Sequence, residues 1–148
     1  MSKGGKKQAK IPFDPSPQKT PVASARIDGS TFSWRFSQGD RSGPWAWTAI
    51  ATDALHREII DRLANHETMS FDEIRKAGSH WIDLYELNKQ NKEVGKRLEA
   101  IRQDDVDGLF SFRINKAGRV FCIRRSQVMS VLWWDPRHEV WPMNITGN

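Results

Sequence analysis

Residues 109–141 read Leu-Phe-Ser-Phe-Arg-Ile-Asn-Lys-Ala-Gly-Arg-Val-Phe-Cys-Ile-Arg-Arg-Ser-Gln-Val-Met-Ser-Val-Leu-Trp-Trp-Asp-Pro-Arg-His-Glu-Val-Trp. Phe110, Phe112 and Ile114 alternate with other side chains, as in a strand with one buried face. The segment 115–118 suits a hairpin turn, because its final glycine tolerates a positive φ. The pattern predicts an antiparallel meander of three strands, at 109–114, 120–123 and 128–134.

Helical spacing precedes this meander. Leu55, Ile59 and Leu63 recur every four residues behind Thr52, which suits an N-cap, and they predict a helix over 52–65. Two more helices are predicted, one after a capping box at 70–73 and one over 89–101, and a strand at 31–37. The expected fold class is α+β: an N-terminal strand, then two to three helices packed on one face of a C-terminal antiparallel meander.

The composition of the 148-residue chain favours one folded domain preceded by a tail. Residues 1–25 hold four prolines and five lysines without a hydrophobic period, so we expect a disordered basic tail followed by a single domain over 26–148. Cys122 is the only cysteine, which excludes an intramolecular disulfide and favours a cytoplasmic protein. No apolar run suits a membrane helix, and no apolar core of a secretory signal follows the N-terminal lysines.

Charge is distributed unevenly along the chain. Residues 109–148 include six basic and two acidic residues, whereas residues 22–108 include 12 basic and 15 acidic residues. A basic sheet attracts phosphate backbones. The other interpretation is that these arginines are solvated or paired with helix carboxylates, as Arg113 would be with an aspartate of 104–107.

A short motif lies in the tail. Gln8, Ile11 and Phe13 resemble the peptide by which many bacterial proteins dock on the replication sliding clamp, although Ala9 departs from the commoner leucine. Ile11 and Phe13 would enter an apolar pocket while Gln8 hydrogen-bonds at its rim. The motif predicts a partner-binding segment.

The order of elements over 28–141 resembles the RelE/ParE toxin superfamily. The similarity in sequence consists of an Arg-Ile end to one strand, an Arg-Val start to the next, and a closing His-x-Val-aromatic. The chain also resembles an uncharacterised bacterial group with a Leu-Trp-Trp-Asp-Pro-x-His signature. In the RNA-cleaving branch the sheet presents arginines and lysines, often with a tyrosine or histidine near the C-terminus. The resemblance implies catalytic roles for Arg113, Arg119 and His138, and RNA-binding roles for Lys116, Arg124, Arg125 and Trp134.

The implied chemistry needs no metal or other cofactor. Cleavage of RNA through its own 2′-OH needs a base, an acid and cations for the charged phosphorane, which His138 and the arginines would supply. The four histidines have no metal-ligand spacing. In the competing interpretation, His138 is a turn residue after Asp135-Pro136. Trp133 and Trp134 point to opposite faces of the sheet, so at least one of them lies in the core.

Three functional hypotheses follow. The first is a cytoplasmic toxin of a toxin–antitoxin system that binds RNA or the ribosome, cleaves RNA if the histidine is catalytic, and pairs with a cognate antitoxin. The second is a non-enzymatic inhibitor or accessory factor that docks on the sliding clamp through Gln8, Ile11 and Phe13. A small binding module of a mobile element is the third interpretation, and no membrane partner is expected.

Overall fold

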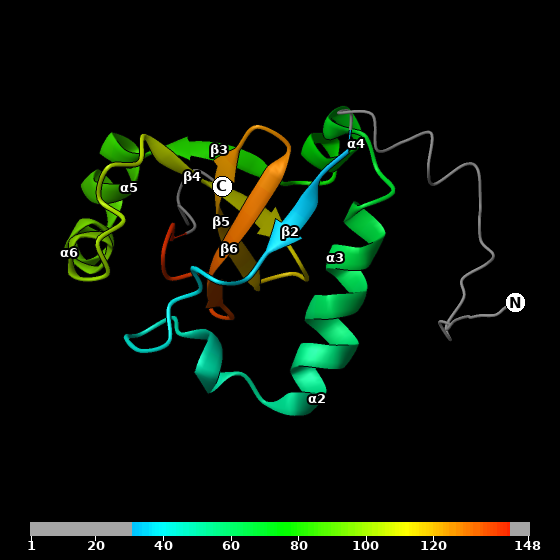
Figure 1. The fold of residues 1–148 in the computed structure, drawn as a ribbon, viewed down its shortest axis with the longest axis horizontal. Helices are drawn as coiled ribbons and strands as arrows, with labels where there is room; N and C mark the ends of the chain where they lie inside the picture. The colour runs from blue at the N-terminus through cyan, green and yellow to red at the C-terminus, as the bar shows by residue number, and fades with distance from the viewer. Residues whose placement is uncertain (1–30, 143–148) are drawn as a thin grey trace, which may run out of the picture.

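The computed structural model describes residues 31–142, which form an α+β fold around a five-stranded mixed sheet in the order β2-β6-β5-β4-β3 (Figure 1). The predicted meander is confirmed, with antiparallel pairing between its neighbouring strands. One edge strand, β3, pairs antiparallel with β4, and the other, β2, pairs parallel with β6. The strands are β2 (Ser33–Arg35), β3 (His80–Asp83), β4 (Gly108–Arg113), β5 (Arg119–Arg125) and β6 (Val128–Asp135).

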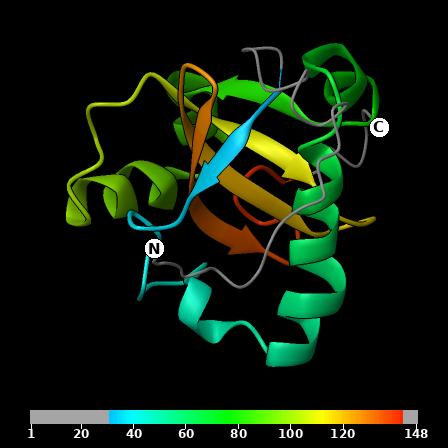
Figure 2. The ribbon, with the colours of Figure 1, turned by 45° about the vertical axis from the view of Figure 1, so that its right-hand side comes forward.

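The helix predicted over 52–65 is present as one continuous helical stretch, seen clearly in Figure 2. It comprises α2 (Thr52–Ala54), η3 (Leu55–Ile60) with π-helical geometry, and α3 (Asp61–His66). Ala51, not Thr52, occupies the N-cap position, and it makes no side-chain cap hydrogen bond. The π-helical turn within the stretch is uncommon in proteins and is frequent at functional sites.

The capping box predicted at 70–73 is confirmed and starts α4 (Phe71–Lys76). Ser70 Oγ accepts a hydrogen bond from Glu73 N at 3.2 Å, and Ser70 N donates to Glu73 Oε1 at 2.8 Å. Most of the helix predicted over 89–101 is present, but it begins after Asn91, whose side chain caps it, and residues 89–90 end the preceding helix. The remaining helices are η2 (Trp47–Ala49), α5 (Leu84–Gln90) and α6 (Lys92–Ala100).

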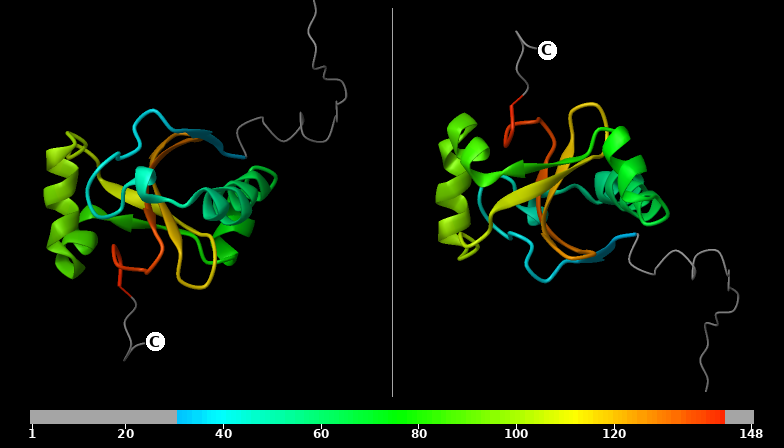
Figure 3. Two further views of the ribbon diagram at one scale, coloured as in Figure 1. Left: turned by 90° about the horizontal axis from the view of Figure 1, so that it is seen from below. Right: turned by 90° about the horizontal axis from the view of Figure 1, so that it is seen from above.

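Helices cover both faces of the sheet, which corrects the prediction of a single covered face (Figures 1 and 3). On one face, Ile59, Leu63 and Ile74 of η3, α3 and α4 pack on alternate strand residues. On the other face, Leu87, Val94 and Leu98 of α5 and α6 pack on the residues in between. Both sides of the central strands are apolar, so helices must cover each side for its apolar surface to be buried from water.

The two adjacent tryptophans of β6 face opposite ways, as predicted, and both are buried. In the β5–β6 pairing, Phe121 lies opposite Trp133 and Cys122 opposite Val131, so Leu132 is an extra residue in β6. This bulge turns Leu132 and Trp133 toward the same core, which alternation alone would not allow. No helix within 31–142 is long and apolar enough to cross a membrane.

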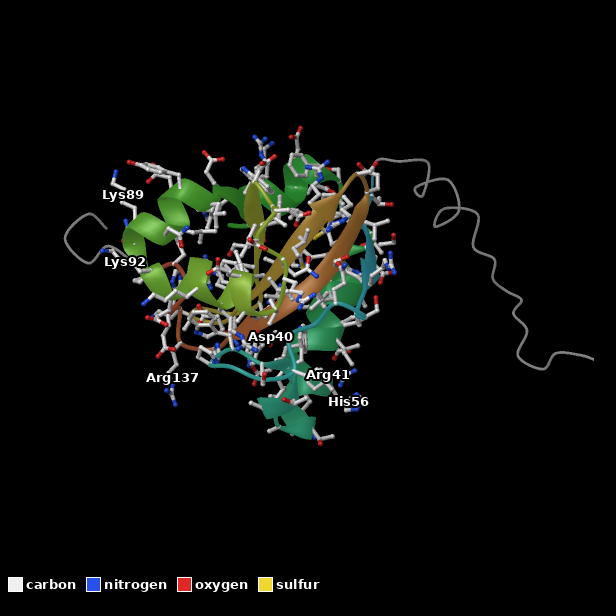
Figure 4. The ribbon with its side chains drawn as sticks, turned by 60° about the vertical axis from the view of Figure 1, so that its left-hand side comes forward. Asp40, Arg41, His56, Lys89, Lys92 and Arg137 are labelled. Atoms are coloured by element: carbon white, nitrogen blue, oxygen red, sulfur yellow. The ribbon has the colours of Figure 1, made fainter. Side chains whose placement is uncertain are left out.

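Asp40 ties the loop after β2 to the sheet and to α6 (Figure 4). Its buried carboxylate accepts hydrogen bonds from Arg97 Nε at 2.8 Å, Arg97 Nη2 at 2.7 Å and Trp133 Nε1 at 2.8 Å. Burial alone would raise the pKa of Asp40, but these hydrogen bonds outweigh burial, and the pKa lies below its ordinary value. Because Asp40 binds Arg97 of α6 and Trp133 of β6 at the same time, it fixes where α6 lies against β6.

Replacing Asp40 with alanine would remove the carboxylate partner of the Arg97 guanidinium, which would keep only its hydrogen bonds to Ser42. It would also leave the buried indole N–H of Trp133 without its acceptor. We expect Asp40→Ala to lower the free energy of unfolding by about 3 kcal/mol, measured by urea denaturation. Asp53→Ala is the matched control, because Asp53 forms an exposed ion pair with Arg57 and its loss costs under about 1 kcal/mol. Equal losses in the two variants would contradict a special role for Asp40.

Candidate functional site

The basic residues predicted to share one sheet face are divided between the two ends of β5. Arg113, Lys116 and Arg119 lie at or beside the β4–β5 turn, whereas Arg124 and Arg125 end the strand. Arg125 follows Arg119 by six positions along the strand, a distance of about 20 Å. One basic surface therefore does not form, and each end has its own surroundings.

Arg119 and Trp134 are buried and hold the turn together. Arg119 Nη1 donates hydrogen bonds to the carbonyl oxygens of Asn115 and Gly118, each at 3.0 Å. The ring of Trp134 lies against Gly118, where an added Cβ would come within 2.4 Å of it. Neither side chain is placed to meet RNA, because Arg119 is committed to backbone carbonyls and Trp134 is only 8% exposed.

Arg124 and Arg125 lie at the other end of β5 beside acidic residues. The guanidinium of Arg124 stacks over the rings of Phe32 and Phe71, at 5.3 and 5.0 Å from their centroids. Arg124 and Arg125 line a hollow together with Asp105 and Asp107. These carboxylates offset the arginines, so this end is a poorer phosphate site than its arginines alone suggested.

His138 lies in the turn after β6 and is not among the residues that line a hollow with Arg113. It has a φ of 61°, and its Nδ1 is buried with no hydrogen-bond partner within 31–142. Asp135 closes this turn by accepting hydrogen bonds from Glu139 N at 2.9 Å and Val140 N at 2.7 Å. These contacts fit the interpretation of His138 as a turn residue.

A basic cleft of about 250 Å³ lies between α3 and the β4–β5 turn. Arg62, Arg113 and Lys116 line it, and no carboxylate is found among the described residues of its lining. The complete lining is Arg62, Asn65, His66, Met69, Ala77, Arg113, Ile114, Asn115 and Lys116. Three exposed cations around one concave surface favour the binding of an anion, because their positive fields add there.

Local structure holds the cations of the basic cleft in place. Gly78 has a φ of 105°, and an added Cβ there would lie 3.0 Å from Arg113 Cδ, so glycine lets the arginine lie close over the turn after α4. Arg113 N donates to the buried Ser79 Oγ at 2.9 Å. Arg62 Nε donates to Ile114 O at 3.1 Å, which leaves the other guanidinium nitrogens available to a ligand.

His66 contributes a buried imidazole to the lining of the basic cleft. Its ring packs against Phe112 with centroids 5.3 Å apart, and its Nδ1 has no hydrogen-bond partner within residues 31–142. Burial, together with the positive charge of Arg62, lowers the pKa of His66 to about 4. The ring is therefore neutral at pH 7 and can exchange hydrogen bonds with a ligand without adding charge.

The cleft contains two of the residues predicted from sequence, Arg113 and Lys116, and several that were not predicted. Arg62, Asn65 and His66 come from α3, some fifty residues earlier in the chain. One signal was available: His66 follows Leu63 by three residues and so lies on the same helical face as Leu55, Ile59 and Leu63, where a polar residue is out of pattern. The residues predicted for clamp docking, Gln8, Ile11 and Phe13, lie outside the described residues.

Searches of protein-family models, curated proteins and solved structures found nothing that matches this chain. Within 31–142 no three His, Cys, Asp or Glu side chains gather as metal ligands would.

The lowered pKa of His66 makes stability depend on pH. An unfolded chain takes up a proton near the ordinary pKa of 6.5, whereas the folded chain resists protonation down to about pH 4. Stability is therefore fully present above pH 6.5 and falls as the pH drops toward 4, by up to about 3 kcal/mol. Urea denaturation across this window should show a flatter profile for His66→Phe.

His56→Gln is the control for that experiment, because His56 is exposed on the same helical stretch. We expect its profile to follow that of the wild type. If His66→Phe lost stability in parallel with the wild type between pH 6.5 and 4, His66 would not be the group responsible.

Proposed function

We propose that this protein binds single-stranded RNA through the basic cleft, as a toxin-like protein. The observation that supports the proposal most directly is the convergence of Arg62, Arg113 and Lys116 on a hollow with no carboxylate in its described lining. Phosphate contacts from lysine and arginine dominate affinity for nucleic acids. Arginine also offers a planar pair of donors that matches two phosphate oxygens.

A single strand suits this cleft better than a duplex does. Single-stranded RNA can turn phosphates and unstacked bases into a concave site, whereas an A-form helix is recognised mainly by its shape over a long surface. The cleft has both components that such a strand needs. Cations bind the backbone, and the side-chain amide of Asn65 can pair with a base edge.

Binding, rather than cleavage, is the activity that we propose first. The imidazole that lines the cleft with the cations is His66 and not His138. Because the pKa of His66 is about 4, it would be a weak general base near neutral pH. The arginines could still stabilise a charged phosphorane, so the test below also follows RNA integrity.

The toxin-like role adds a cellular location and a protein partner to the proposal. RNA would be met in the cytoplasm, and a cognate antitoxin would act by covering the basic cleft. An acidic protein segment is the chemistry that would compete with phosphate for Arg62, Arg113 and Lys116.

Removing one cation of the cleft should weaken RNA binding. We expect Arg113→Ala and Lys116→Ala each to raise the dissociation constant for a fluorescent single-stranded RNA about tenfold, in anisotropy titrations at fixed salt. The slope of log affinity against log salt should also fall by about one for each variant. Lys92→Ala is the matched control, since exposed Lys92 belongs to α6 on the opposite face of the sheet (Figure 4).

Expression in bacteria tests the toxin-like role. Wild-type protein should arrest growth, and Arg113→Ala should relieve the arrest, with the Lys92→Ala control behaving as the wild type. Total RNA from the same cultures reports cleavage. Arrest that persists in Arg113→Ala, together with unchanged RNA affinity in that variant, would exclude the basic cleft as the site of action.

A further inference from the structure

A second hollow of about 560 Å³ continues the basic cleft along the helix formed by η3 and α3. The two hollows share four lining residues, Arg62, Asn65, Ile114 and Asn115, and so form one groove. Its larger part lies in the size range of small-molecule and cofactor sites, roughly 300–1,000 Å³. The groove is therefore long enough to hold more than a phosphate.

The two parts of the groove differ in charge. The basic cleft presents cations without a carboxylate among the described residues that line it, whereas the larger hollow adds Glu58 and Asp61. Glu58, Asp61 and Arg62 fall at helical positions i, i+3 and i+4, which places them on one side of the helix. One end of the groove thus offers donors and positive charge, and the other offers carboxylate oxygens, which only accept hydrogen bonds.

The carboxylate end is available to a ligand. Glu58 Oε1 accepts a hydrogen bond from Asn115 Nδ2 at 3.0 Å, which orients the carboxylate beside the turn. Asp61 is exposed and makes no ion pair within residues 31–142. Arg57, the cation that the larger hollow adds, is engaged by Asp53 at 2.8 Å. Glu58 belongs to the π-helical segment, a geometry frequent at functional sites.

We propose that this groove selects guanine: a phosphate of the bound RNA lies on Arg62, Arg113 and Lys116, and the base next to it pairs with Glu58 or Asp61. Guanine presents two adjacent donors, N1–H and the N2 amino group, which match the two oxygens of one carboxylate. Adenine, cytosine and uracil each present an acceptor beside their donor on that edge, and this acceptor would face a carboxylate lone pair. Sites built on such pairing reject bases that lack the matching donors.

The inference rests on the proposed RNA binding and adds a base preference to it. The test uses oligouridylate strands of equal length that carry one central guanosine, adenosine or inosine, titrated by anisotropy. We expect the guanosine strand to bind the wild type about tenfold more tightly than the adenosine strand. Inosine lacks the N2 amino group but keeps N1–H, and its strand should fall between the two.

Asp61→Asn and Glu58→Gln identify the carboxylate that makes the pair. An amide presents a donor of its own, so substitution of the pairing residue should bring the guanosine and adenosine affinities to within about twofold of each other. Asp72→Asn is the matched control, an exposed aspartate on α4 with the same change in charge. Its guanosine preference should equal that of the wild type.

The outcomes separate the two proposals. If all three strands bind equally and Arg113→Ala weakens them alike, the basic cleft binds RNA but the guanine preference is wrong. If a preference exists and survives both carboxylate substitutions, the base lies elsewhere and the inference is also wrong. If no strand binds the wild-type protein, the proposed function itself is overturned.

Discussion

The central strands of this protein are apolar on both sides, and that constraint governs the rest of the structure. A sheet with one apolar face could leave its other face to arginines and water. Here α5 and α6 bury the second face, so charged side chains are driven to the ends of the strands and to the turns. The basic region becomes a cleft beside a turn, not an open sheet surface.

Burial on both faces also encloses two carboxylates, Asp40 and Asp135, and each accepts hydrogen bonds from specific partners. Asp40 accepts hydrogen bonds from Arg97 and Trp133, which joins a loop, a helix and a strand at one carboxylate. Asp135 accepts hydrogen bonds from two backbone amides of its own turn. Unpaired, either carboxylate would cost several kcal/mol in the interior, so these contacts select one arrangement of the surrounding loops.

The basic cleft and the groove that extends it depend on two segments remote in sequence. The helix η3–α3 supplies Glu58, Asp61, Arg62 and His66, while the β4–β5 turn supplies Asn115 and Lys116. Arg62 binds Ile114 O and Asn115 binds Glu58, so the same contacts that dock the helix on the turn also orient the groove. The difference in charge along the groove follows from the order of residues on this helix. The carboxylates of Glu58 and Asp61 precede Arg62, whose charge joins those of the cations beside the β4–β5 turn.

The sequence by itself determined the meander, the long helix and the capping box, because each is encoded by local spacing or by neighbouring residues. It also identified Arg113 and Lys116 as cations near a turn. Only the tertiary structure decided that helices cover both faces, that Arg119 and Trp134 are buried, and that His66 and Arg62 join Arg113. The physical reason is that exposure and proximity depend on how elements far apart in the chain pack together, which no local pattern records.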